Sequence, residues 1–213
     1  MKVKIKKGKK TKDYNIINSW SDVTLDKWLT LIGYENLSGS EEALKVVKLF
    51  SDIPTKLIKQ LSVQDVALVM KRLTDLQTEQ NTTLNKIIEI DGVEYGFHPD
   101  LEEITLGEYA DIETYIKLGI DKYLPELCAI LFRPVIEKKN NIYTIEAYNG
   151  NIKIRSEIFK KMPAEQVQNM LVFFWTFVNK LFQILPSYLM QRTEEMSTQS
   201  QAKVSQKSGV GSE

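Results

Sequence analysis

Lys86-Ile-Ile-Glu-Ile-Asp91-Gly92-Val-Glu-Tyr-Gly-Phe97 is the stretch of sequence that decides the fold. Two short apolar runs lie on either side of Asp91-Gly92. This dipeptide is preferred in a type I′ turn, because both central residues of that turn need a positive φ. The pattern predicts a β-hairpin over residues 86–97 in a chain whose other segments have mostly helical spacing.

The segments that follow this hairpin alternate between helix and strand patterns. Thr105-Leu-Gly-Glu108 is a capping box, which predicts a helix that ends at Gly119. A second helix is predicted over residues 123–132, because Pro134 prevents it from continuing. Apolar runs at 142–148 and 152–154 flank Asn149-Gly150 and predict a second hairpin.

The segments that precede the hairpin form a small helical layer. Helices are predicted over residues 25–32 and 41–50, a third opens at Pro54, and a fourth is capped by Ser62. The core stripe of the fourth helix is expected to be Val66, Val69, Met70, Leu73 and Leu76. Val3 and Ile5 alternate with lysines, which indicates a short strand or hairpin at the N-terminus.

The longest predicted helix follows Pro163 and covers residues 164–190. It is apolar on most of its sides, as expected for a helix in a deep core, in an oligomer or in a membrane. Its apolar run is too short to span a bilayer, which needs about 20 residues. Core burial is the preferred interpretation, with the aromatic residues Phe173 and Trp175 as candidates for contact with a partner.

Together these patterns predict an α+β fold with a small N-terminal helical layer, two β-hairpins packed with helices, and one long buried C-terminal helix. The expected organisation is a basic arm or short strand at 1–20, a helical subdomain at 21–80, an α+β domain at 86–190 and a tail at 191–213. The tail has almost no apolar residues, so it is expected to be flexible.

Composition is that of a globular protein in a reducing compartment. The 213 residues are 43% hydrophobic and 26% charged, which excludes a chain disordered over its whole length and a collagen-like rod. Cys128 is the only cysteine, so no internal disulfide can form. A cytoplasmic location is the expectation.

A net charge of zero hides an uneven distribution. Residues 1–20 carry seven lysines and one acid, a charge of +6, and the rest of the chain carries −6. Residues 89–113, the acidic block, contain nine acidic residues and no Lys or Arg. The candidate partner-binding residues are therefore four lysines and four acids: Lys6, Lys7, Lys9, Lys10, Glu102, Glu103, Asp111 and Glu113.

The basic arm allows three interpretations. It could be a solvated terminus, or it could lie against the acidic block of its own chain or of a neighbouring copy. It could also neutralise phosphates and bind nucleic acid, with a steep dependence on salt. No Arg occurs before Arg72, so nothing in the arm indicates that it reads bases.

Residues that could carry chemistry are few. His98 is the only histidine and stands alone in a loop, where a metal site would need further ligands. Cys128 lies among apolar residues and is expected to be a core thiol. No phosphate-binding loop, dinucleotide fingerprint or nucleophile elbow occurs in the sequence. We therefore expect no enzyme activity, cofactor, metal or small-molecule substrate.

Three stretches carry a resemblance to a known group of proteins: residues 92–109, Leu131-Phe-Arg-Pro134, and Lys161-Met-Pro163 with the Phe-Phe-Trp helix that follows. In this order they resemble small structural or assembly proteins of tailed bacteriophages, particularly phages of Bacteroidetes, including tail assembly chaperone-like proteins. The resemblance covers residues 86–190.

The resemblance implies a protein that works through its surfaces. It would either chaperone another phage protein in the host cytoplasm or form part of a ring or connector in the virion. Its partners would be other phage structural proteins and itself, with no membrane. Two other classes remain open: a nucleic-acid-binding accessory protein that uses the lysine arm, and a cytosolic enzyme without a recognisable site.

Overall fold

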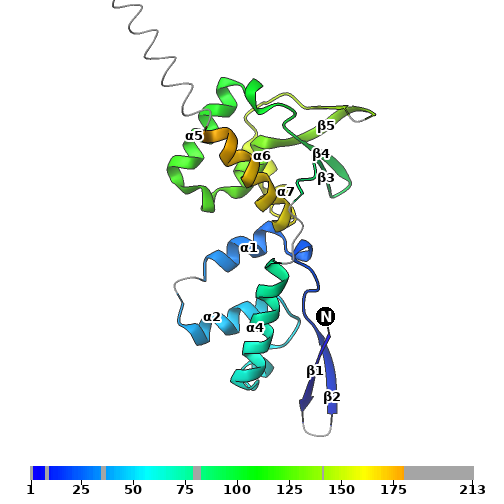
Figure 1. Ribbon diagram of the computed structural model, residues 1–213, viewed down its shortest axis with the longest axis vertical. Coiled ribbons are helices and arrows are strands. Elements are labelled where there is room, and N and C mark those ends of the chain that lie inside the picture. The colour runs from blue at the N-terminus through cyan, green and yellow to red at the C-terminus, as the bar shows by residue number, and fades with distance from the viewer. Residues whose placement is uncertain (1, 8–9, 35–36, 79–82, 141, 180–213) are drawn as a thin grey trace, which may run out of the picture. The chain divides into compact units, whose positions relative to one another are not determined.

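The computed structural model describes residues 2–7, 10–34, 37–78, 83–140 and 142–179 (Figure 1). Lys9, the expected boundary near residue 80, residues 180–190 of the predicted long helix and the predicted tail lie outside these ranges. The chain divides into two compact units, Met1–Met170 and Leu171–Glu213.

The first unit begins with a lysine-rich β-hairpin. Strands β1 (Lys2–Lys7) and β2 (Lys10–Asn15) are antiparallel partners, as the alternating pattern predicted. The chain then returns to the helices through Asn15, whose backbone N–H and side-chain amide both donate to the Asp52 carboxylate. The hairpin is therefore fixed at its base to the segment that follows α2.

Four helices follow the hairpin and a short 3-10 turn, Trp20–Asp22. They are α1 (Leu25–Ile32), α2 (Gly39–Leu49), α3 (Thr55–Ile58) and α4 (Val63–Thr78). The predicted cap of the fourth helix is confirmed, since Ser62 Oγ accepts from Asp65 N. Helix α1 is capped by Thr24 Oγ1, which accepts from Lys27 N, and it ends at Gly33. We call residues 2–78 the N-terminal layer.

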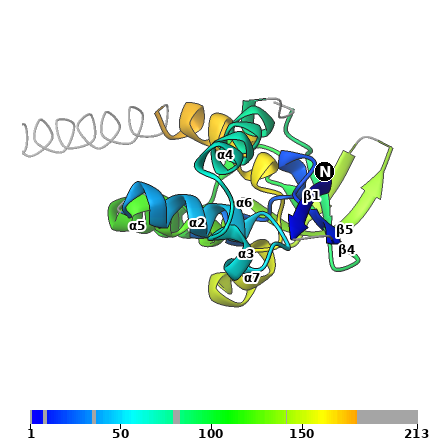
Figure 2. The same cartoon turned by 90° about the horizontal axis from the view of Figure 1, so that it is seen from below.

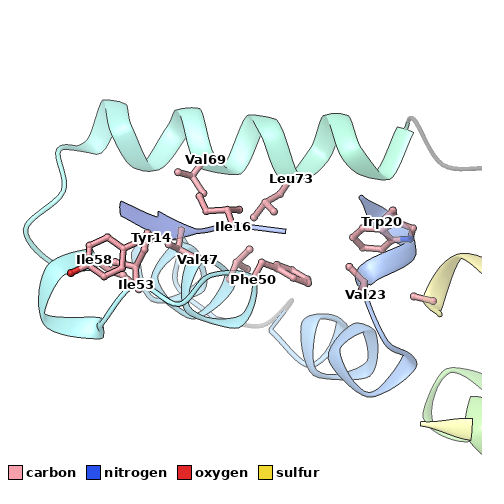
Figure 3. Packing of buried hydrophobic residues seen from close by; sticks show 12 residues of the cluster. Tyr14, Ile16, Trp20, Val23, Val47, Phe50, Ile53, Ile58, Val69 and Leu73 are labelled. Atoms are coloured by element: carbon pink, nitrogen blue, oxygen red, sulfur yellow. The ribbon is translucent and has the colours of Figure 1, made fainter. Parts of the chain in front are cut away.

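The core of the N-terminal layer forms between α2, α4 and the end of the hairpin. Figure 3 shows Val69 and Leu73 of α4 directed toward Ile16, with Val47 of α2 and Phe50, the residue after α2, on the other side. All five side chains are at most 7% exposed. The predicted stripe of α4 is thus confirmed, since Val69, Leu73 and Leu76 are buried and Val66 and Met70 are partly buried.

The next segment, residues 83–159, contains a four-stranded antiparallel sheet, and we call it the sheet region. Its strands are β3 (Ile87–Ile90), β4 (Val93–Phe97), β5 (Phe132–Lys139) and β6 (Ile142–Ile145), in the order β3-β4-β5-β6. Figure 2 shows β4 and β5 side by side. Asp91 and Gly92 have φ of 53° and 79°, which confirms the predicted turn.

Three helices accompany this sheet. They are α5 (Leu106–Gly119), α6 (Leu124–Leu131) and α7 (Ile152–Phe159), with 3-10 turns at Leu101–Glu103 and Ile120–Lys122. The Thr105/Glu108 capping box of α5 is present as predicted. Leu127 to Phe132 are each at most 1% exposed, so α6 is the most deeply buried helix described. The predicted α+β class is confirmed.

The predicted second hairpin around Asn149-Gly150 is wrong. Strand β6 pairs with β5, and the chain reverses near Asn140 instead. Residues 152–159 form helix α7, because their inward positions are Ile152, Arg155, Ser156 and Phe159, which have helical spacing. Two of these four residues are polar, so the apolar pattern of the sequence did not show the helical face.

Residues 164–179 form the described part of the predicted long helix. Ala164, Val167 and Met170 are fully buried, and the segment before them is joined to α1, since Leu25 N donates to Met162 O and Ala164 N to Val23 O. Among residues 171–179, the described part of the second unit, the exposed large apolar side chains are Val172, Phe173 and Trp175, at 68%, 51% and 42%.

None of the described helices has the length and apolar character needed to cross a membrane.

Candidate functional site

A groove of about 650 Å³ runs between β1 and α4, and we call it the β1–α4 groove. Its apolar lining comes from three places: Ile5 of β1, Ile53 and Leu61 before α4, and Leu68 and Val69 of α4. Charged side chains line it too, among them Lys4, Asp65, Lys71, Arg72 and Asp75. The groove is thus amphipathic.

The local sequence explains why this groove has an apolar surface. Helix α4 begins at the Ser62/Asp65 cap and turns Val69 and Leu73 into the core. Leu68 cannot share that face, because consecutive helical residues point about 100° apart, and it remains 69% exposed. Helix α4 therefore carries apolar side chains outside the side that packs in the core.

A second groove of about 400 Å³ lies between α2 and α4. It is lined mainly by Ala43 and Leu44 of α2, Ile58 of α3, and Val63 and Val66 of α4. Leu61 lines both grooves, and Val63 is 87% exposed. The first turns of α4 therefore carry an apolar surface on two sides.

The wall formed by the β1–β2 hairpin is basic. Lys4, which lines the groove, is exposed, and the hairpin sequence contributes most of the +6 charge of residues 1–20. Lys6, Lys7 and Lys10 lie on its strands, and Lys7 stands opposite Lys10 in the register.

The predicted acidic candidates fall into two groups. Glu102 and Glu103 are exposed in the 3-10 turn before α5. Asp111 instead accepts a hydrogen bond from the Tyr148 hydroxyl, and Glu113 forms an ion pair with Lys117 at 2.9 Å. Glu102 and Glu103 are thus exposed, whereas Asp111 and Glu113 are engaged by other side chains of the same region.

A buried charged cluster lies at the start of α5, and the sequence alone did not reveal it. Glu108 is 1% exposed and its Oε1 lies 2.8 Å from Nη2 of Arg133, which is also buried. Glu108 Oε2 accepts hydrogen bonds from the backbone N–H and hydroxyl of Thr105, at 2.7 and 2.6 Å. His98 Nε2 lies 3.7 Å from Glu108 Oε1.

The electrostatics of this cluster favour a structural role. Burial lowers the pKa of His98, an effect that Arg133 reinforces and Glu108 opposes, so the imidazole is neutral at pH 7. The Glu108 carboxylate is ion-paired with Arg133 through Oε1 and accepts hydrogen bonds from Thr105 through Oε2. His98 Nδ1, Glu108 Oε1 and Arg133 Nε are buried without a hydrogen-bond partner in the described structure, although Glu108 Oε1 is ion-paired with Arg133.

The cluster also lacks the features of a metal site or a nucleophile. Across the described ranges, no group of three or more His, Cys, Asp and Glu side chains is placed to hold a metal ion. Cys128 is fully buried, and burial raises the pKa of its thiol far above the usual range. A thiol in this state is not an effective nucleophile.

Arg133 was missed because the sequence pattern Leu131-Phe-Arg-Pro134 was interpreted only as a helix stop. Its position is nevertheless informative, since an Arg beside Phe132 at the buried start of β5 needs a buried acid. The grooves around α4 were missed because the pattern of α4 shows its core stripe and says nothing of its neighbours.

The structure thus defines an α+β protein with an amphipathic groove, a basic hairpin and an acidic turn held by a buried ion pair. Comparisons with family models, curated proteins and solved structures find no match to this chain. Its function is therefore inferred from these residues.

Proposed function

We propose that this chain is a non-enzymatic protein that acts through contacts with other proteins in the morphogenesis of a tailed bacteriophage. It would serve as a tail or virion assembly chaperone, or as a structural ring or connector component. The observation that carries the proposal is the β1–α4 groove, where Leu68 is 69% exposed beside a basic hairpin. The order of motifs over residues 86–190 is what favours a phage protein.

The groove suits an acidic amphipathic segment of a partner. Its apolar lining can accept leucine-like side chains, and full burial of one such side chain is worth about 1.5–3 kcal/mol. The lysines of the hairpin would attract carboxylates next to those side chains. A partner helix with an apolar stripe flanked by acidic residues would match both the apolar lining of the groove and the lysines of the hairpin.

A designed peptide tests this proposal directly. The probe is a fluorescent amphipathic helix with leucines at helical spacing and glutamates elsewhere, and its binding is followed by fluorescence anisotropy. We expect Leu68→Asp to weaken binding at least about tenfold, since about 1.4 kcal/mol corresponds to that factor. The matched control is Ile154→Asp on α7, where the side chain is 73% exposed, and it should bind like the unchanged protein.

Two results would contradict the proposal. One is an affinity that Leu68→Asp leaves unchanged. The other is equal affinity for a peptide with lysines in place of the glutamates, since the basic wall should repel it. Mass spectrometry of purified particles then separates the two roles, because a chaperone leaves the assembly and a ring or connector component stays in it.

The alternative function is nucleic-acid binding, and it is favoured by the presentation of the lysines on a two-stranded ribbon. Each neutralised phosphate would make binding fall steeply with salt. The −6 charge of residues 21–213 opposes this alternative. A salt titration with long double-stranded DNA distinguishes the two functions, and our proposal predicts no binding at physiological salt.

A further inference from the structure

We infer that the occupant of the β1–α4 groove is residues 100–106 of a second copy of this chain, so that copies associate head to tail. This inference rests on the proposed function and names the partner of the same groove. We call residues 100–106 the acidic turn. It includes the 3-10 turn Leu101–Glu103 and the start of α5.

The acidic turn combines charge with an exposed apolar side chain. Asp100, Glu102 and Glu103 are exposed and contribute three negative charges. Leu106, three residues beyond Glu103, is 79% exposed, more than any other large apolar side chain of the described sheet region. A leucine beside several carboxylates is the chemistry that the groove and its basic wall select.

The backbone of the acidic turn is fixed before any partner arrives. The Asp100 carboxylate accepts from Glu102 N at 2.9 Å, and Thr105 caps α5 through the box with Glu108. Glu108 is in turn held by Arg133 inside the sheet region. A rigid turn loses little conformational freedom on binding. The buried ion pair is costly to desolvate, and its role would be to keep the turn rigid.

The β1–α4 groove and the acidic turn are complementary in charge and in apolar character. Leu106 would enter the apolar lining formed by Ile5, Leu61 and Leu68, and the three acids would face the basic hairpin. Charges of this kind attract only at short range, since screening reaches about 8 Å at physiological ionic strength. The apolar contact is therefore needed to bring the charges together.

Because the groove and the acidic turn are different surfaces, their contact is heterologous. A pair of copies would still have one free groove and one free turn, so association continues until a ring closes or a filament forms. This geometry is the one required of a ring or connector component.

Charge reversal tests the inference. One variant carries Lys4→Glu and Lys71→Glu in the groove, and the other carries Glu102→Lys and Glu103→Lys in the turn. In sedimentation velocity we expect the unchanged protein to associate and each variant alone to sediment as a monomer. An equimolar mixture of the two variants should associate again, because each reversed surface meets a complementary one.

The controls separate contact from folding. Leu106→Asp should abolish association, whereas Lys153→Glu and Ile154→Asp, both at exposed positions of α7, should leave it unchanged. Circular dichroism of each variant verifies that the fold is kept.

Two outcomes would overturn the inference, and they differ from failure of the proposed function. The first is an unchanged protein that stays monomeric at high concentration, and the second is a mixture that does not recover association. If the designed acidic peptide still binds the groove in either case, the second copy is excluded and the proposed function stands. If the peptide does not bind either, both fail.

Discussion

The N-terminal layer and the sheet region differ in where they place their charged side chains. In the sheet region, Glu108 and Arg133 are buried and paired inside the protein. In the N-terminal layer, Val63 and Leu68 are exposed and lysines crowd the adjacent hairpin. The sheet region thus uses a buried pair of charges to hold its shape, whereas the N-terminal layer places a basic hairpin beside an apolar groove.

The largest expected effect comes from breaking the buried pair. Glu108→Ala would leave the Arg133 guanidinium buried without its acid and would remove the Glu108 half of the capping box of α5. We expect a loss of about 3–5 kcal/mol in the free energy of unfolding, measured by urea denaturation. The control Glu103→Ala, at an exposed position of the same segment, should stay within about 0.5 kcal/mol. A loss below 1 kcal/mol in Glu108→Ala would show that the pair does not hold the region together.

A smaller effect is expected at Gly96 of β4. A Cβ added there would lie 2.6 Å from the Tyr143 ring and 2.7 Å from Ile145, so the cross-strand packing would have to move. Gly96→Ala should destabilise the protein by about 1–3 kcal/mol. Gly39→Ala at the start of α2 is the matched control, because a Cβ there meets nothing within 4 Å. It should be neutral or stabilise by up to about 1 kcal/mol, and a similar loss at both glycines would contradict the packing described for the sheet.

A weaker effect should depend on pH. Burial lowers the pKa of His98 in the folded protein below the 6.5 of a free imidazole, so the unfolded chain takes up a proton that the folded protein resists. The stability contributed by neutral His98 is complete above pH 6.5 and is lost as the pH falls below it. His98→Gln should therefore show a shallower loss of stability between pH 6.5 and 5 than the unchanged protein. Parallel curves would mean that His98 is not buried in its neutral form.

The smallest effect on stability is expected in the N-terminal layer. Leu68→Asp alters a side chain that is 69% exposed, so the free energy of unfolding should change by no more than about 0.5 kcal/mol. The same substitution should strongly weaken peptide binding. A large loss of stability would instead show that Leu68 packs in the core and is not part of the groove surface.

Local signals in the sequence predicted much of the fold. The turn at Asp91-Gly92, the Thr105/Glu108 box and the Ser62 cap each depend on residues within four positions of one another, and all three are confirmed. The α+β class followed from these signals. Such short-range interactions can be predicted from a single sequence, because the residue types and their spacing are enough to determine them.

Longer-range features were not predictable in this way. Strand β6 was assigned to the wrong partner because pairing with β5 depends on a turn at Asn140, which carries no Asn-Gly or Asp-Gly signal. Helix α7 was missed because Arg155 is buried through its contacts with Glu146 and Asn149.

The candidate site was predicted only in part. The charge imbalance indicated the basic hairpin and the acidic turn by sequence alone, and the structure places Glu102 and Glu103 on the surface. The groove depends on β1 lying next to α4, two elements more than 50 residues apart. The Glu108–Arg133 pair likewise joins positions 25 residues apart. Neither contact has a local signature.

The central claim is that the β1–α4 groove binds partners and the buried pair only supports the fold. The most direct test is a titration of the acidic amphipathic peptide into Leu68→Asp and Glu108→Gln side by side, with both variants verified as folded. Our account predicts that Leu68→Asp weakens the affinity at least about tenfold and that Glu108→Gln leaves it unchanged. The reverse pattern, with binding lost in Glu108→Gln and kept in Leu68→Asp, would contradict it.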